Sequence, residues 1–269
     1  MKIINNKKNL KNLINQQKSL GFVPTMGGIH KGHLSLIKKC NKFNKKTLVS
    51  IFVNAPQFNN KNDYVNYPRS IKADINKIKK LNVDYLYLPV LKEIYPKGPN
   101  KKIKISSFAK KLCGKFRPGH FHSVVDVIER FIKIIKPSSI YLGEKDMQQL
   151  KIVEDFIKKN YKNIKVIGCK TVREKNGIAL SSRNLLLSRK EKNISSKVFK
   201  IIKKNKKNIL EKNINLSDIK NKILKIGVKK IDYINLIDVN KINKPFIRIK
   251  KNKIFIAYYL GNTRLIDNI

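Results

Sequence analysis

Residues 21–37 read Gly-Phe-Val-Pro-Thr-Met-Gly-Gly-Ile-His-Lys-Gly-His-Leu-Ser-Leu-Ile, a short apolar stretch followed by a glycine-rich segment and an apolar pattern of helical period. Phe22 and Val23 are typical of a buried strand, whereas Leu34 and Ile37 lie three residues apart and share one face of a helix. The glycines between them permit a tight turn. The stretch therefore predicts a strand, a turn and a helix in succession.

The same alternation continues through the first part of the chain. Apolar stretches rich in β-branched and aromatic residues predict strands at 47–53, 83–88, 139–142 and 165–167. Apolar residues at helical spacing predict helices over 71–81, over 123–136 up to Pro137, and around 150–157. Repeated strand-helix units indicate a doubly wound, Rossmann-like parallel sheet with helices on both faces. Ligands of such sheets bind at the carboxyl ends of the strands, so we expect the site in the turns after Val23, Val53 and Leu142.

A second kind of sequence begins after residue 171. Ser188 and Glu191 have the spacing of a capping box and open a long lysine-rich helical stretch. Short strands are predicted beyond it at 230–236, 246–248 and 254–259. We therefore expect a Rossmann-like domain over 1–171 and a smaller α+β domain over 172–269.

The charge is strongly basic. Among 269 residues, 61 are Lys or Arg and 17 are Asp or Glu, a formal net charge of +44. Such a balance raises the possibility of a nucleic-acid-binding protein. The lysines, however, are spread along the whole chain instead of forming one basic arm, so we expect solvated surface, weak nonspecific binding of polyanions and no specific nucleic acid partner.

The cysteines and the apolar stretches indicate the cellular compartment of the protein. Cys40, Cys113 and Cys169 are far apart and have no metal-binding spacing, which favours reduced thiols in a cytosol. No apolar stretch approaches the roughly 18 residues of a membrane span, and residues 1–6 lack a signal-peptide pattern. We expect a cytoplasmic protein that does not bind membranes.

The glycine-rich turn has the chemistry of a phosphate site. Gly27, Gly28 and Gly32 allow close approach of backbone, and a helix N-terminus follows at once. The glycine spacing is that of a P-loop, but His33 and Leu34 stand where such a loop needs Lys and Ser or Thr. The imidazoles of His30 and His33 can instead donate hydrogen bonds to phosphate oxygens. A purely structural histidine pair is the alternative; we favour function because these are two of only four histidines.

Four further polar segments lie in turns or loops, two of them directly after strands. They comprise Asn54 with Gln57, Arg117 with His120, Glu144-Lys145-Asp146, and Ser181-Ser182-Arg183. The amides suit a small polar ligand, and the cations suit phosphate. Each segment alone is also compatible with a capped loop, a charged helix start, a structural turn or a polar linker.

Together the ordered motifs resemble the pantothenate synthetase (pantoate–β-alanine ligase) family. The matching segments are 24–27 with His30-x-Gly-His33, 52–54, 117–121, 143–146 with Gln148-Gln149, 181–184 and the closing 260–268. The resemblance spans nearly the whole chain. The H-x-G-H motif alone would indicate only the wider nucleotidyl-transferring superfamily, so another nucleotidyltransferase acting on a different acid or phosphate acceptor is the alternative.

The resemblance implies an ATP-dependent reaction in two steps. The pantoate carboxylate attacks the α-phosphorus of ATP, giving pantoyl adenylate and pyrophosphate, and the β-alanine amine then displaces AMP. Mg²⁺ is implied with the ATP phosphates, and a homodimer is implied as the assembly. Pantoate, β-alanine and ATP are the implied small-molecule substrates.

The resemblance also assigns residues. Its implied catalytic groups are His30, His33 and Lys145, with His33 as proton donor and Lys145 as stabiliser of the phosphoryl transition state. The implied ATP-binding residues are Met26, Gly27, Gly28, Ile29, His30, Lys31, Gly32, His33, Gly143, Glu144, Lys145, Asp146, Val172, Leu180, Ser181, Ser182 and Arg183. Those implied for pantoate and β-alanine are Gln57, Gln149, Asn54, Arg117 and His120, and Asp74 is implied as a metal contact. The sequence departs from the family pattern at Ala55, Cys113 and Asn176, where the family usually has Pro, an acidic residue and Asp.

Overall fold

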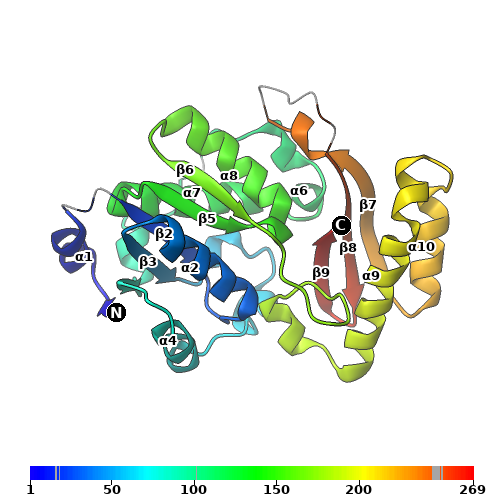
Figure 1. The fold of residues 1–269 in the computed structure, drawn as a ribbon, viewed down its shortest axis with the longest axis horizontal. Coiled ribbons are helices and arrows are strands. Elements are labelled where there is room, and N and C mark those ends of the chain that lie inside the picture. Colours follow the sequence, from blue (N-terminus) through cyan, green and yellow to red (C-terminus); the bar gives the residue numbers. More distant parts are fainter. Residues whose placement is uncertain (16, 18, 101, 244–248, 250) are drawn as a thin grey trace. The chain divides into compact units, whose positions relative to one another are not determined.

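The chain forms two compact units in the computed structural model, which describes residues 1–15, 17, 19–100, 102–243, 249 and 251–269. The larger unit comprises Met1–Glu144 and Gln148–Lys170, and the smaller comprises Lys145–Met147 and Thr171–Ile269. Figure 1 traces both. Within the described residues, no helix has the length and apolar character needed to cross a membrane.

A six-stranded parallel sheet forms the centre of the larger unit, in the order β1-β4-β3-β2-β5-β6. The strands are β1 (Lys2–Ile4), β2 (Leu20–Thr25), β3 (Lys46–Ile51), β4 (Tyr85–Tyr87), β5 (Ser139–Gly143) and β6 (Lys165–Cys169). The predicted parallel sheet is confirmed. The predicted strand at 83–88 is shorter than expected, because only Tyr85–Tyr87 pair with neighbouring strands.

Helices cover both faces of this sheet, as predicted. Along β2, Val23 packs in an apolar cluster with Ile37 of α2 (Lys31–Phe43) and Ile78 of α4 (Ile71–Lys79). The neighbouring side chain, Phe22, lies 5.4 Å from Phe131 of α7 (His120–Ile135), measured between ring centroids. Successive side chains of a strand point to opposite faces, so α2 and α4 cover one face and α7 covers the other.

The remaining helices of this unit are mostly short. They are α1 (Lys7–Ile14), α3 (Lys61–Val65), α5 (Leu91–Ile94), α6 (Cys113–Phe116) and α8 (Met147–Asn160), whose first residue belongs to the smaller unit. Short 3-10 turns are η1 (Ala55–Gln57), η2 (Ser107–Lys110) and η3 (Glu144–Asp146). Helix α7 begins three residues before the predicted 123, after Gly119 at φ 76°, and ends before Pro137 as predicted.

The smaller unit combines two helices with an antiparallel sheet. Its helices are α9 (Arg189–Leu210) and α10 (Leu216–Lys225), its sheet has the order β7-β8-β9, and its 3-10 turns are η4 (Ser182–Leu186) and η5 (Val239–Lys241). The strands are β7 (Lys230–Asp238), β8 (Asn252–Leu260) and β9 (Thr263–Asn268). The predicted capping box is confirmed, since the Ser188 and Glu191 side chains each accept the other's backbone N–H. The strand predicted at 246–248 lies outside the described residues.

All three cysteines are buried and free, so they form no disulfide. Cys40 belongs to α2 and packs in the same apolar cluster as Val23, and burial raises the pKa of its thiol to about 11. The reduced thiols expected from the sequence are therefore core residues in this fold.

Candidate active site

The sheet of the larger unit has a switch point between β2 and β5. From β2 the next strands in sequence, β3 and β4, extend the sheet in one direction, whereas β6 extends it from β5 in the other. Ligands of open parallel sheets bind at such a point, outside the carboxyl ends of the strands. The glycine-rich turn after β2 and the segment beginning at Gly143 both leave the sheet here.

A buried carboxylate from α4 holds the turn after β2. Asp74 is 2% exposed, and its two oxygens accept hydrogen bonds from the backbone N–H groups of Gly28 and Ile29, each at 2.8 Å. One turn further along α4, Lys77 Nζ donates to the carbonyl of Ile29 at 2.7 Å. Gly27 and Gly28 have φ of 83° and 61°, values that favour glycine. The side chain of Ile29 is buried, so this residue presents only backbone to a ligand.

The two histidines of the H-x-G-H motif cap helix α2. His30 Nδ1 accepts from the backbone N–H of Gly32 at 3.1 Å, and His33 Nδ1 accepts a longer bond from the N–H of His30 at 3.4 Å. Their ring centroids are 4.1 Å apart. An N–H can only donate, so both Nδ1 atoms carry a lone pair, and each neutral ring carries its proton on Nε2. Each histidine thereby carries its ring N–H on Nε2, and Lys31 and Gly32 form the first turn beside them.

The amides after β3 lie next to this turn. The Gln57 side-chain nitrogen is 2.8 Å from the Met26 sulfur, and Asn54 Nδ2 donates to Gln57 Oε1 at 3.1 Å. Asn54 is 1% exposed and also accepts from the Tyr95 hydroxyl at 2.7 Å. Burial raises the pKa of Tyr95, so its hydroxyl remains a donor. The structure therefore places the Gln57 side chain against Met26 in the turn after β2, with Asn54 hydrogen bonded to it.

Arg117 and His120 also support Gln57, through its backbone. His120 Nδ1 lies 2.9 Å from the Gln57 carbonyl, and an Arg117 nitrogen donates to the same oxygen at 3.2 Å. A carbonyl only accepts, so His120 carries its proton on Nδ1, and its Nε2 accepts from Arg117 at 3.1 Å. This tautomer is the opposite of that in His30 and His33.

The glutamine pair at the start of α8 divides into two roles. Gln148 is 5% exposed; its Oε1 accepts from the Cys113 backbone N–H, and its Nε2 donates to the carbonyls of Phe108 and Lys111. Gln149 is half-buried, and no hydrogen bond joins its side chain to another part of the described chain. Within the described residues, Gln148 is thus the member of the pair with a structural role, and the predicted ligand role of Gln149 stays a prediction.

A second set of predicted residues belongs to the smaller unit. Lys145 Nζ lies 3.4 Å from Asp146 Oδ1, and the Lys145 side chain is 19% exposed. Residues 172–183 form a loop in which the Leu180 N–H donates to the Val172 carbonyl at 3.0 Å. Ser181 caps the 3-10 turn η4 by accepting from the N–H of Arg183, while the side chain of Ser182 is buried. Glu144 and Gly143 remain with the larger unit.

Comparison with known proteins identifies the family. The sequence model described as pantoate-beta-alanine ligase matches residues 2–269. The chain belongs to the pantoate–β-alanine ligase family. It is 41% identical over 264 residues to the pantothenate synthetase of Sulfurihydrogenibium sp. (strain YO3AOP1), covering 94% of this chain and 92% of the relative. It is 40% identical over 271 residues to that of Fervidobacterium nodosum, covering 99% and 96%.

Solved structures of this ligase family share the whole fold. A crystal structure of pantoate-beta-alanine ligase from Francisella tularensis, complexed with beta-gamma ATP and beta-alanine, aligns at a TM-score of 0.88 with 39% identity, covering 100% of this chain and 97% of that one. Pantothenate synthetase from Thermus thermophilus aligns at 0.89 with 28% identity, covering 100% and 99%. The similarity therefore includes both units.

The described residues contain no cluster of three or more His, Cys, Asp or Glu placed to hold a metal ion. Asp74, the predicted metal contact, directs both carboxylate oxygens to the amides of Gly28 and Ile29. The role that the structure shows for Asp74 is to hold the turn, which the sequence did not reveal; its position in the first turn of a helix was the only signal.

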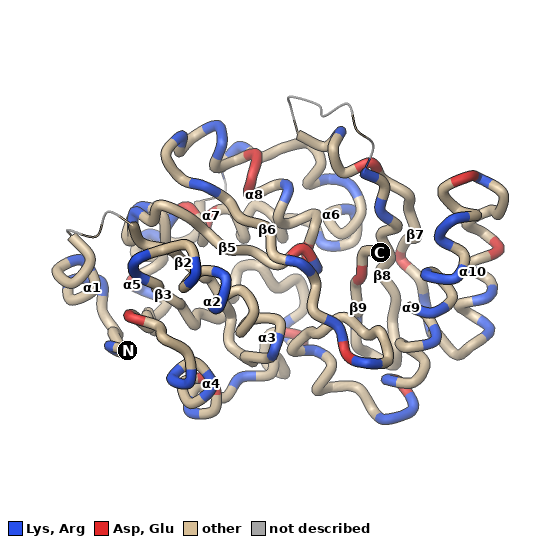
Figure 2. Tube along the Cα trace, in the orientation of Figure 1, with Lys and Arg blue, Asp and Glu red and all other residues tan. Residues whose placement is uncertain are grey.

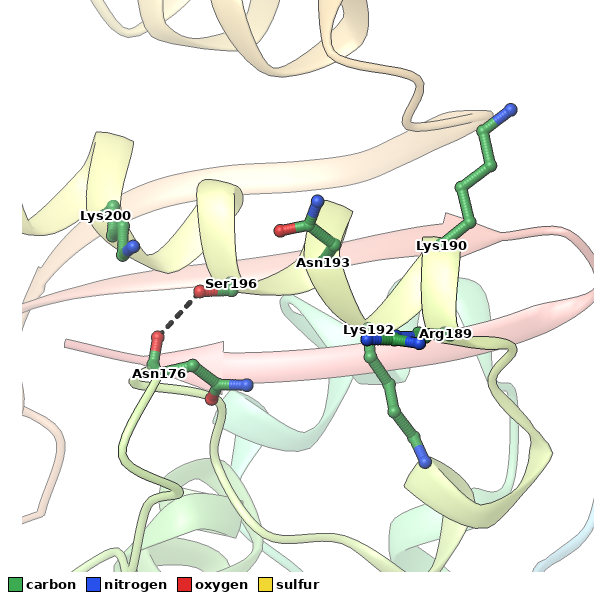
Figure 3. A pocket seen from close by; sticks show the side chains of 7 residues that line it. All are labelled: Asn176, Arg189, Lys190, Lys192, Asn193, Ser196 and Lys200. Atoms are coloured by element: carbon green, nitrogen blue, oxygen red, sulfur yellow. Dashed lines mark hydrogen bonds between the residues drawn. The ribbon is translucent and has the colours of Figure 1, made fainter.

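An open cavity of about 670 Å³ lies in the smaller unit along the first turns of α9. It is lined by four cationic side chains, Arg189, Lys190, Lys192 and Lys200, and the Ser196 hydroxyl donates to the Asn176 carbonyl beside them (Figure 3). None of the predicted site residues lines it. Lys and Arg positions occur along both units (Figure 2), so a basic lining is expected at any hollow in this chain and does not single out a ligand.

Proposed function

We propose that this protein joins pantoate to β-alanine at the expense of ATP, forming pantothenate, AMP and pyrophosphate through pantoyl adenylate. Family membership over residues 2–269 supports the reaction. The structural observation that supports the proposal best is the contact between Gln57 and Met26. It places an amide that can bind a small acid next to the turn that precedes His30 and His33. The alternative, a nucleotidyltransferase for another acceptor, is not favoured by any relative described above.

The adenylation step makes an oxygen–phosphorus bond. An oxygen of the pantoate carboxylate attacks the α-phosphorus of ATP, the bond to the bridging oxygen breaks, and pyrophosphate leaves. The Nε2–H groups of His30 and His33 donate to phosphate oxygens as charge develops there, and Lys145 supplies a cation. Gln57 and Gln149 hold pantoate in position for the attack.

The neutral tautomer of His33 carries its ring N–H on Nε2. With Nδ1 accepting from the backbone of the cap, neutral His33 donates a hydrogen bond from Nε2; to act as the proposed proton donor, the ring must first be protonated at Nδ1, which replaces that cap bond. General acid assistance of this kind contributes roughly 10² to 10⁴ in rate. The β-alanine amine then attacks the acyl carbon, the acyl–oxygen bond breaks so that AMP leaves with the bonding electrons, and the proton that the amine nitrogen loses passes to water.

The remaining nucleotide contacts in this proposal come from both units. Gly143 and Glu144 of the larger unit precede Lys145 and Asp146 of the smaller one, and Val172 with Leu180 to Arg183 closes over ATP. Closure of this kind excludes water from an adenylate that would otherwise hydrolyse.

Mg²⁺ enters with the ATP phosphates in this proposal. Magnesium binds through substrate phosphates and retained water, with few protein carboxylates. This mode fits a site whose buried carboxylate, Asp74, is hydrogen bonded to two backbone amides. The ion would neutralise phosphate charge. We also propose that the protein acts as a homodimer in the cytoplasm, and sedimentation of the purified chain tests the dimer.

Pantoate-dependent exchange of labelled pyrophosphate into ATP tests the function. We expect exchange with pantoate and Mg²⁺, no exchange when pantoate is omitted, and loss of exchange when Mg²⁺ is chelated. A folded preparation that exchanges only with a different acid would support the other nucleotidyltransferase. Absence of exchange with pantoate would overturn the proposal.

A further inference from the structure

The closing segment of the chain matches the family but has no part in the proposed chemistry. Its last strand, β9, ends at Asn268, which is 2% exposed although its side chain is an amide. Buried amides require hydrogen-bond partners, since an unsatisfied polar group costs free energy. The partners of Asn268 therefore show what this segment holds.

Asn268 holds the backbone of Lys145. Its Nδ2 donates to the Lys145 carbonyl at 2.8 Å, across 123 positions of sequence. Its Oδ1 accepts from Lys253 Nζ on β8, also at 2.8 Å. Lys253 fixes which end of the amide is the oxygen, because an ammonium group can only donate, and so directs the NH₂ group to Lys145.

The adjacent residue holds the other predicted nucleotide-binding segment. Asp267 forms a bidentate ion pair with Arg173, with oxygen–nitrogen distances of 2.7 and 2.8 Å. Arg173 also donates to the carbonyls of Gly177 and Asn268, and its guanidinium lies 4.5 Å from the ring centroid of Phe199. Bidentate pairs that are also stacked have a defined geometry, so the base of the 172–183 loop is anchored to β9.

We propose that Asp267 and Asn268 are positioning residues for adenylation. Neighbouring residues of one strand fix the Lys145 backbone and the 172–183 loop to the same body, so the cation and the loop keep a constant spacing. Asn268 acts through Lys145 and Asp267 through Arg173; neither is proposed to contact ATP. This inference rests on the proposed function, because it concerns how Lys145 is held for that reaction.

Asn268→Asp isolates the bond to Lys145. It has the same size and keeps an acceptor for Lys253, but it replaces the donor to the Lys145 carbonyl with an oxygen. Asn268→Ala removes both bonds. The matched control is Asn262→Ala, an exposed asparagine at the opposite end of the β8–β9 hairpin.

The kinetic readout is pantoate-dependent exchange measured at varied ATP and pantoate. Misplacement of a catalytic group by about 1 Å can cost roughly 100-fold in rate. We expect Asn268→Asp to lower kcat by about tenfold to 100-fold with the KM for pantoate unchanged, and Asn262→Ala to match the wild type. An unchanged kcat in folded Asn268→Asp would overturn the proposal.

Hydrogen–deuterium exchange on the intact chain without substrate gives an independent readout. Peptides covering residues 145–147 should exchange faster in both Asn268 variants than in Asn262→Ala, with the sheet of the larger unit unaffected. Equal exchange in all three variants would overturn the proposal even if activity fell. Because this measurement needs no reaction, failure of wild-type activity alone would count against the proposed function and not against the anchoring.

Discussion

The two turns predicted to face phosphate are held in different ways. The turn after β2 is fixed inside the larger unit by Asp74, a carboxylate 46 residues away that accepts two backbone N–H groups. The turn after β5 leaves that unit at Lys145, whose backbone is fixed by Asn268 of the last strand. The histidine donors are therefore attached to the parallel sheet, whereas the lysine is attached to the antiparallel one. The groups proposed to contact phosphate are therefore held by residues of different units.

Among the variants that test this comparison, replacement of His33, the proposed proton donor, should have the largest effect. His33→Ala should fold normally, and its adenylation rate should be lower than that of the wild type by a factor of about 10² to 10⁴, because the variant lacks the Nε2–H donor. Pyrophosphate exchange and thermal melting measure the two quantities. The matched control is His122→Ala on α7, which should retain wild-type exchange. Near-native turnover of His33→Ala would reject the assigned role.

Asp74→Ala should disturb the first turn and leave the second intact. The buried N–H of Ile29 and the partly buried N–H of Gly28 would lose their acceptor, and an unsatisfied buried group costs about 1–3 kcal/mol. We expect the free energy of unfolding to fall by about 2–4 kcal/mol in urea titrations. Asp218→Ala is the control, since it removes an exposed carboxylate from the first turn of α10 and should change stability by about 0.5 kcal/mol or less. Equal losses of unfolding free energy in the two variants would contradict the role of Asp74 in holding the turn.

The glutamine pair after β5 separates binding from support. Gln149→Ala should raise the KM for pantoate about threefold to tenfold, the range of one lost hydrogen bond, and leave the Tm unchanged. Gln148→Ala removes three backbone partners and should lower the Tm by several degrees. Steady-state kinetics and melting curves distinguish these outcomes. A raised KM for pantoate in Gln148→Ala together with a lowered Tm in Gln149→Ala would show that the two roles are the other way round.

The smallest effect is expected in the loop that Arg173 anchors. Asn176 stands where the family usually has Asp, and its Oδ1 accepts from the N–H of Ile178 at 3.1 Å. Asn176→Asp keeps this acceptor and should change the unfolding free energy by less than about 0.5 kcal/mol. Exchange kinetics should also be unchanged. A large loss of either would show that the amide nitrogen, and not the acceptor, matters here.

Local patterns were sufficient for most elements of the fold. The β-branched stretches near 47–53 and 139–142 became strands of one parallel sheet, and the Ser188 capping box began α9 as predicted. Strand β9 was not recognised as a strand. Its charged and apolar residues follow each other in Thr-Arg-Leu-Ile-Asp-Asn without strict alternation, and its pairing with β8 supplies the stability that the pattern does not show.

Sequence alone determined which groups this protein offers: a glycine-rich turn with two histidines, amides after a neighbouring strand, and a lysine after another. Composition, spacing and periodicity are properties of the sequence itself, so they can be determined before the fold is known. The tertiary structure decided how those groups are used. It directed Asp74 to two backbone amides, gave His120 and His33 opposite tautomers, and tied Lys145 to the last strand. These outcomes depend on hydrogen bonds between residues far apart in the chain, and partners of that kind are chosen only when the chain has folded.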